Sequence, residues 1–299
     1  MFDFIVNIVG SHECDYPESC VNNLPTLTSS TISFTTSLDV DRQVREHLET
    51  GQGLYSVDTE ALSRLKPDVI VTQSLCKVCS VDFCLVQKIA LEMECQPKVV
   101  DTNPQDFLEV LSDVERIGKA IGLEESGRRV RKNLEARIER VQGHVQDVVT
   151  SRPRVVMMEW TDPIFIGGHW TPQIIHLAGG EHPLNLPDGT GRGVSGAGHS
   201  FTVTPEQVTS CDPDVIIIAP CGLDMASTIR ETKSFVEATW WNDLKAVKEN
   251  NVWLVDGNHM FNRPGPRLVD ALEWLCWMLH GKLDSPGRLD FPAIKLSDV

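Results

Sequence analysis

The feature of this 299-residue sequence that most limits its fold is a long amphipathic segment at residues 124–149. At about 1.5 Å per residue a helix there would be about 39 Å long, which is more than an ordinary connection between two strands requires. We therefore expect a rigid helix that connects two lobes, with a coiled-coil dimer as the alternative. The apolar residues recur at steps of three and four and share one helix face: Val130, Leu134, Ile138, Val141, Val145 and Val148.

On both sides of this helix, β-branched runs alternate with amphipathic segments. This alternation predicts an α/β fold of two doubly wound lobes with parallel-type sheets. The expected strands are at 4–9, 24–28, 53–57, 68–72, 97–101, 154–158, 214–219 and 251–255. The expected helices are at 39–49, 58–65, 80–94, 104–121, 172–178, 205–210, 225–238 and 266–280.

These elements divide the chain into four regions. We expect an N-terminal α/β lobe at 1–103, connecting helices at 104–150, a C-terminal α/β lobe at 151–285 and a tail at 286–299. Residues 180–200 are rich in glycine and predict a long loop, and loops of that length are usually functional or mobile.

Charge and hydropathy narrow the choice of partners and compartment. The formal net charge of −15 disfavours nucleic acid and anionic membrane surfaces, and no apolar run is long enough for direct membrane insertion. The first ten residues lack the basic start of a signal peptide, and nine cysteines in a chain of this size favour a reducing compartment. The expected location is cytoplasmic for the chain as given, and periplasmic or secreted only if its N-terminus is incomplete.

Most chemically distinctive residues follow an expected strand. The motifs are SHECDYP, QSLCKVC, EWTDPIFIGGHW, PCGLD and GNHMFNRPGPR. Open parallel sheets bind ligands beyond the carboxyl ends of their strands. Two such edges joined by a rigid helix predict a small-molecule site in a cleft between the lobes.

The pair Cys76-x-x-Cys79 has three interpretations. A thiol pair between a strand and a helix suits thiol–disulfide chemistry, so an enzyme centred on these cysteines, redox or metal-dependent, is the alternative function. Together with His12 and Cys14 the pair could instead bind a metal ion, if the two loops are adjacent. The third interpretation is a loop that lines a ligand site. No G-x-S-x-G, P-loop or H-E-x-x-H motif is present, which favours a non-catalytic protein.

Several motifs together resemble the cobalamin-binding branch of the Fe/B12 periplasmic-binding domain family. They are SHECDYP, TQSLCKVC, EWTDP, GGHWTPQIIHLAGG, DPDVIIIAPCGLD and VDGNHMFNRPGPRLVD, in this order from about Val9 to His280. The resemblance implies two lobes joined by a long helix, with cobalamin, haem or a ferric siderophore held between them for delivery to a membrane transporter. Family members begin with a βα unit before the strand that leads into HECD, so the N-terminal lobe here is expected to lack its first βα unit.

The expected ligand is cobalamin or a related corrinoid. Trp160, Trp170 and Phe261 would stack on it, and Asn258 and Arg263 would hold its polar groups. A histidine, His12, His169 or His199, would make an axial contact. The complete expected set of ligand-binding residues is His12, Glu13, Cys14, Asp15, Gln73, Cys76, Cys79, Trp160, His169, Trp170, His199, Cys221, Asn258, Phe261 and Arg263.

Overall fold

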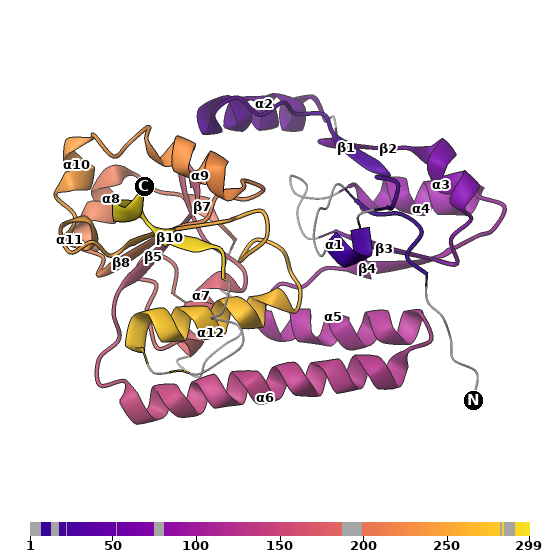
Figure 1. The fold of residues 1–299 in the computed structure, drawn as a ribbon. Coiled ribbons are helices and arrows are strands. Elements are labelled where there is room, and N and C mark those ends of the chain that lie inside the picture. The colour runs from indigo at the N-terminus through magenta and orange to yellow at the C-terminus, as the bar shows by residue number, and fades with distance from the viewer. Residues whose placement is uncertain are drawn as a thin grey trace. The chain divides into compact units, whose positions relative to one another are not determined.

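The computed structural model describes residues 7–12, 18–21, 23–51, 53–74, 81–186, 199–281, 283 and 291–299. It divides into two compact units (Figure 1). Unit 1 comprises Met1–Pro104 and Asp113–Val130, and unit 2 comprises Gln105–Ser112 and Arg131–Val299. Each unit combines helices with β-sheet, which confirms the predicted α/β class.

Unit 1 contains two short sheets. Strands β1 (Thr28–Ser30) and β2 (Tyr55–Val57) pair antiparallel, and β3 (Val69–Gln73) and β4 (Lys98–Thr102) pair parallel. The antiparallel pair adds to the parallel pairing that we expected. Four helices accompany the strands in the described part of this region: α1 (Glu18–Val21), α2 (Ser37–Thr50), α3 (Thr59–Leu65) and α4 (Phe83–Glu92).

The core of unit 1 includes Leu62 of α3, Ile89 of α4 and Met93, which directly follows α4. The strand expected at 4–9 falls partly outside the described residues, and residues 7–9 form no strand.

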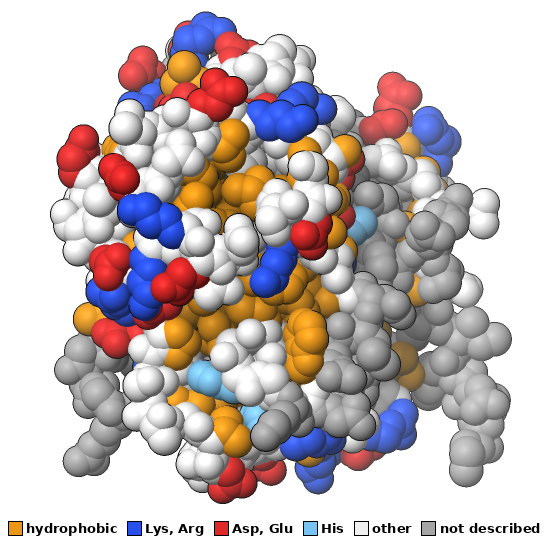
Figure 2. Space-filling model, turned by 60° about the vertical axis from the view of Figure 1, so that its left-hand side comes forward, with side chains coloured by type: hydrophobic (Ala, Val, Ile, Leu, Met, Phe, Trp, Pro, Cys, Tyr) orange, Lys and Arg blue, Asp and Glu red, His pale blue; other side chains and the backbone are white. Residues whose placement is uncertain are grey.

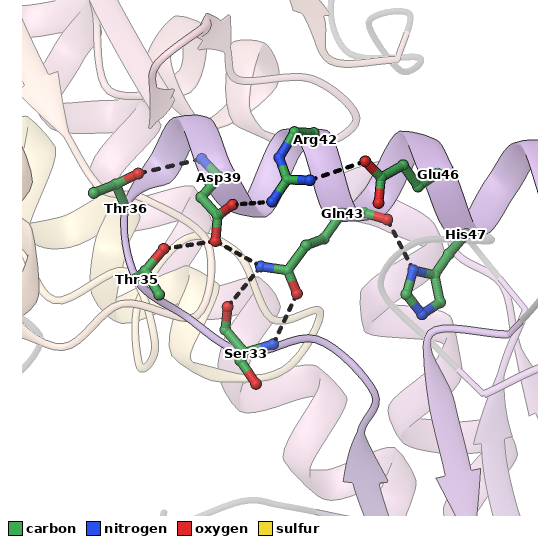
Figure 3. Close-up of polar contacts among 8 residues, drawn as sticks. All are labelled: Ser33, Thr35, Thr36, Asp39, Arg42, Gln43, Glu46 and His47. Carbon is green, nitrogen blue, oxygen red and sulfur yellow. Dashed lines mark hydrogen bonds and ion pairs between the residues drawn. The ribbon is translucent and has the colours of Figure 1, made fainter.

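Side chains fix the start of α2 (Figure 3). The Thr36 hydroxyl accepts a hydrogen bond from the backbone N–H of Asp39, which is the usual N-cap arrangement. The Asp39 carboxylate accepts hydrogen bonds from Thr35 and Arg42. Gln43 bonds both backbone groups of Ser33, so the preceding loop is tied to the first turns of the helix.

Two long helices follow β4. Helix α5 spans Phe107–Ala120, and α6 spans Glu124–Val148 with 25 residues, which confirms the predicted long helix. The boundary between the units falls within α6, after Val130. Leu134, Ile138, Val141 and Val145 are buried, as the pattern predicts, whereas Val130 and Val148 are exposed because they lie toward the ends of the stripe.

Unit 2 is built on a mixed six-stranded sheet with the order β10-β9-β8-β5-β6-β7. The central strands β5 (Val155–Thr161), β8 (Val215–Ile218) and β9 (Val252–Val255) are parallel. The flanking strands β6 (Ile164–Ile166), β7 (Phe201–Thr202) and β10 (Ala293–Lys295) pair antiparallel, so the sheet is mixed around the expected parallel centre. Strand β10 also shows that the segment expected as a tail belongs partly to this sheet.

Continuous apolar runs explain the central strands. The side chains of Val155–Met158 and Ile216–Ile218 are completely buried, as expected for strands covered on both faces. The remaining helices of the described part are α7 (Thr171–Leu177), α8 (Pro205–Ser210), α9 (Met225–Thr232), α10 (Thr239–Asn242), α11 (Lys245–Lys248), α12 (Arg267–His280) and the 3₁₀ turn η2 (Leu296–Asp298). Among the described helices, none is long and apolar enough to cross a bilayer.

A buried histidine makes the stability of unit 2 depend on pH. His182 is 1 % exposed, and burial lowers its pKa to about 4. An unfolded histidine titrates near ~6.5, so the unfolded chain takes up a proton before the folded one as the pH falls. The neutral, buried His182 therefore costs no free energy of folding well above pH ~6.5. We expect the free energy of unfolding to fall by about 2 kcal/mol between pH 7.5 and pH 5.

Urea unfolding at a series of pH values, followed by tryptophan fluorescence, measures this slope. His182→Leu is expected to flatten the slope over that interval, with His47→Gln on α2 as the control. An unchanged slope in the His182→Leu variant would refute the assignment.

Candidate ligand-binding site

The predicted site residues of unit 2 gather where its parallel strands end. We define the rim as residues 159–170, 199–200, 219–223 and 256–263. The first segment runs from the end of β5 through β6 to the start of α7, the second precedes β7, and the last two follow β8 and β9. Because β5, β8 and β9 run in the same direction, their carboxyl ends lie at one edge of the sheet. The rim is therefore the candidate site within this unit.

An irregularity in β5 shapes the first part of the rim. The register with β6 shifts between Met158 and Trp160, which leaves Glu159 in a β-bulge. The Glu159 carbonyl accepts a hydrogen bond of 2.9 Å from the backbone N–H of Cys221. A bulge redirects the side chains beside it, and Trp160 is partly exposed here, opposite Phe165 of β6.

The loops after β8 and β9 are joined by backbone contacts. The Asn262 amide donates hydrogen bonds to the carbonyls of Ala219 (2.8 Å) and Gly257 (3.0 Å). A Cβ atom on Gly257 would lie 2.0 Å from the Pro220 carbonyl oxygen, so only glycine fits this close approach. The two loops consequently form one continuous and rigid part of the rim.

Arg263 and Asn258 contact each other on the rim. The guanidinium donates from Nε to the Asn258 carbonyl at 2.6 Å and from Nη2 to its side-chain oxygen. Both residues are only partly buried. This contact holds the planar guanidinium in place, and an arginine fork held in this way suits a carboxylate or an amide.

Two of the three histidines of the rim, His169 and His199, lie together. The ring centroids of His169 and His199 are 5.0 Å apart, and His169 has a left-handed backbone with φ of 50°. Burial, with the neighbouring His199, lowers the pKa of His169 below its usual value. His169 is therefore neutral at pH 7, the form in which imidazole can coordinate a metal.

Trp170 and Phe261 are packed inside unit 2. They are 4 % and 1 % exposed, and the Trp170 indole N–H donates a 2.6 Å hydrogen bond to the Phe261 carbonyl. Of the three aromatic residues expected to stack on a ligand, only Trp160 is presented at the surface of this unit. For Trp170 and Phe261, burial favours a packing role that supports the rim.

The remaining predicted residues are in unit 1 or outside the described residues. His12 shares a hydrogen bond with the Thr28 hydroxyl, its ring centroid is 5.2 Å from that of Tyr55, and Gln73 is the last residue of β3. Cys221, whose backbone N–H bonds Glu159 on the rim, is exposed. Glu13, Cys14, Asp15, Cys76 and Cys79 fall outside the described residues, so the metal set of His12 with three cysteines stays a prediction.

A cavity of about 520 Å³ lies elsewhere, between α3 and α4 of unit 1. It is lined by Thr59, Glu60, Ser63, Arg64, Ile89, Glu92 and Met93, none of which is among the predicted site residues.

Charged groups on the surface are largely interspersed (Figure 2). On the face that the figure shows, acidic and basic side chains lie beside one another, with hydrophobic side chains between them. Arg154 pairs with Asp212 at 2.8 Å, and Lys245 pairs with Asp214 at 2.7 Å. The charges of these four residues are therefore paired within the protein.

The comparisons with known proteins agree with this architecture. The periplasmic binding protein family model matches residues 30–258, and the chain belongs to this family. Proteins of this family are substrate-binding components of ABC transporters and are not catalysts, which supports the non-catalytic interpretation.

One curated relative and two solved structures illustrate the similarity. The uncharacterized ABC transporter substrate-binding lipoprotein YvrC of Bacillus subtilis is 23 % identical over 88 % of this chain and 80 % of its own. The periplasmic heme-binding protein BhuT, solved with two hemes, has a TM-score of 0.64 at 16 % identity and covers 91 % of this chain and 88 % of its own. The vitamin B12 binding protein BtuF of Vibrio cholerae has a TM-score of 0.58 at 19 % identity, covering 89 % and 84 %.

These findings contradict the expected cytoplasmic location. The family is periplasmic, and the Bacillus subtilis relative is a lipoprotein, so the relatives work outside the cytoplasm. The expectation rests on the first ten residues and on the cysteine count, and neither fixes a compartment.

Two residues that position the rim are not apparent from the sequence. Glu159 contributes through a backbone carbonyl in a bulge, and Asn262 contributes by joining two loops. Both lie within the quoted motifs, but only the register of β5 and the packing of the loops reveal these contacts. The glycine and proline residues within GNHMFNRPG indicate an irregular segment, but they do not indicate that it contacts the loop after β8.

Proposed function

We propose that the protein binds cobalamin or a similar metal chelate, haem or a ferric siderophore, and presents it to a membrane transporter. The observation that carries this proposal is the placement of Trp160, the His169–His199 pair and Arg263 on a single rim in a member of the periplasmic binding protein family. An aromatic face, imidazole nitrogens and a planar cation suit a large, flat ligand with a metal centre and carboxylate or amide side groups.

Each group has a distinct role in this proposal. Trp160 provides the apolar face against which the ring of the chelate packs. One imidazole occupies an exchangeable axial position of the metal ion, while Arg263, held by Asn258, bonds a polar side group. Because the β8 and β9 loops are joined at Gly257 and Asn262, the rim changes little on binding, which limits the entropy lost.

A titration with three chelates tests the proposal. Purified protein is mixed with aquocobalamin, haemin or a ferric hydroxamate siderophore, and visible difference spectra and tryptophan quenching are recorded. We expect saturable binding of at least one chelate at micromolar concentration, with cobalamin favoured. Absence of binding by all three would refute the proposed function.

Variants distinguish binding at the rim from binding elsewhere. Trp160→Leu is expected to weaken binding by roughly fivefold, since stacking of an aromatic ring is worth about 1 kcal/mol. The matched control is Trp240→Leu, which replaces a tryptophan of α10 that packs on Phe235 away from the rim. Equal weakening by both substitutions would contradict a site at the rim.

A further inference from the structure

The folding of the β6–β7 pair brings two imidazoles together outside the sheet. Ile166 of β6 lies opposite Phe201 of β7 in an antiparallel register. His169 follows Ile166 by three residues and His199 precedes Phe201 by two, so the register places both at the same end of the pair. The two strands are more than thirty residues apart in the sequence. Their pairing nevertheless brings these two histidines to the same end of the strands.

His169 is held from both sides. The backbone N–H of Gly167 donates to the Met157 carbonyl at 2.9 Å, and the next residue after His169, Trp170, is buried and bonded to Phe261. A Cβ atom on Gly167 would lie 2.7 Å from the Thr171 side chain, so the turn into α7 is tightly packed. The imidazole of His169 is therefore presented from a fixed backbone, while His199 is exposed.

The separation of the rings matches that of two imidazoles on one metal ion. With metal–nitrogen distances of about 2.0–2.1 Å and a tetrahedral angle, the two ring centroids would be about 5 Å apart. The observed separation is 5.0 Å. Imidazole is a good ligand for zinc, copper and nickel.

We infer that His169 and His199 form a two-histidine site for a divalent transition metal ion, which the protein binds directly and without a chelating ligand. With two protein ligands, water would complete the coordination sphere. Such an open site binds metal with micromolar rather than nanomolar affinity. It gives the protein a second class of ligand that occupies part of the same rim.

Metal titration of the purified, chelator-treated protein tests this inference. Ni²⁺ and Zn²⁺ binding is measured by calorimetry in the absence of any chelate, and we expect one equivalent bound with micromolar affinity. His169→Asn and His199→Gln are each expected to weaken binding by roughly tenfold or more. Asparagine is chosen at position 169 because it tolerates the left-handed backbone there.

Control variants separate this site from other metal ligands. His47→Gln removes a histidine of α2 in unit 1 and is not expected to change the affinity. Cys76→Ser with Cys79→Ser removes the thiol pair of the alternative metal set, so metal that still binds to this variant is bound at His169 and His199. Thermal melting without metal checks that the His169→Asn and His199→Gln variants are folded. The Co²⁺ spectrum should show no thiolate charge-transfer band.

The inference is overturned if no metal binds, if both histidine variants bind as tightly as the wild type, or if the cysteine variant alone abolishes binding. These outcomes are independent of the chelate titration. Metal binding without chelate binding would refute the proposed function and leave the two-histidine site intact.

Discussion

Arg137→Met is expected to lower the free energy of unfolding by about 4 kcal/mol, because it removes the cation that bonds both oxygens of the buried Glu273 carboxylate. Arg137 of α6 donates to both oxygens of Glu273 in α12, at 2.9 and 2.7 Å, and also to Asp270. The Glu273 side chain is only 1 % exposed. The hydrogen bonds to Glu273 hold the pKa of Arg137 above its usual value, so the guanidinium stays charged at all ordinary pH values.

Chemical denaturation of three variants measures this effect. Arg131→Met removes an exposed pair with Glu135 on the same helix and should cost less than about 1 kcal/mol. The double variant Arg137→Met with Glu273→Leu should recover much of the loss, because it removes the buried charge as well. A loss below about 1 kcal/mol for Arg137→Met would show that Glu273 is solvated in solution.

Gly257→Ala is expected to destabilise unit 2 by about 3 kcal/mol and to disturb the rim. The added Cβ atom would lie 2.0 Å from the Pro220 carbonyl oxygen and 2.7 Å from the carbonyl carbons of Ala219 and Pro220. These are backbone atoms, which cannot rotate away as the end of a side chain can. The loops after β8 and β9 must therefore separate to make room.

Gly265→Ala is the matched control for this substitution. No atom lies within 4 Å of a Cβ at Gly265, so the free energy of unfolding should change by less than about 0.5 kcal/mol. Both variants are compared by urea denaturation and by chelate titration. A Gly257→Ala protein with wild-type stability would mean that the two loops do not approach each other as described.

The sequence predicted the main elements because their signals are local. Helix α6 has four buried residues at helical spacing, and the strand β8 and the first four residues of β5 are uninterrupted apolar runs. Helix α8 has both a threonine N-cap and a glutamine three residues later, and its bounds agree with the predicted 205–210. Local signals of this kind act within a few residues, which makes them readable in the sequence.

The missed elements depend on contacts between distant segments. Strands β6, β7 and β10 have only two or three residues each, too few to show a period of two. They form because a neighbouring strand supplies hydrogen-bond partners, as β9 does for β10. The same limit applies to sheet direction, since short antiparallel strands at the edges leave no separate mark in the sequence.

The candidate site was predictable in position but not in detail. Distinctive residues after strands located the rim, because the carboxyl ends of parallel strands meet at one edge. Burial separates Trp160, which is partly exposed, from Trp170 and Phe261, which lie in the interior. Trp160 lies near the end of β5, and Trp170 and Phe261 follow β6 and β9 by a few residues. Only the packing of α7 and the β9 loop therefore distinguishes a stacking surface from a supporting core.

The most direct test of a ligand site at the rim is hydrogen exchange of the protein with and without saturating aquocobalamin. We predict slower exchange in residues 159–170, 219–223 and 256–263, with little change in α8 and α11. Unchanged exchange in all three rim segments, with cobalamin bound, would contradict the account.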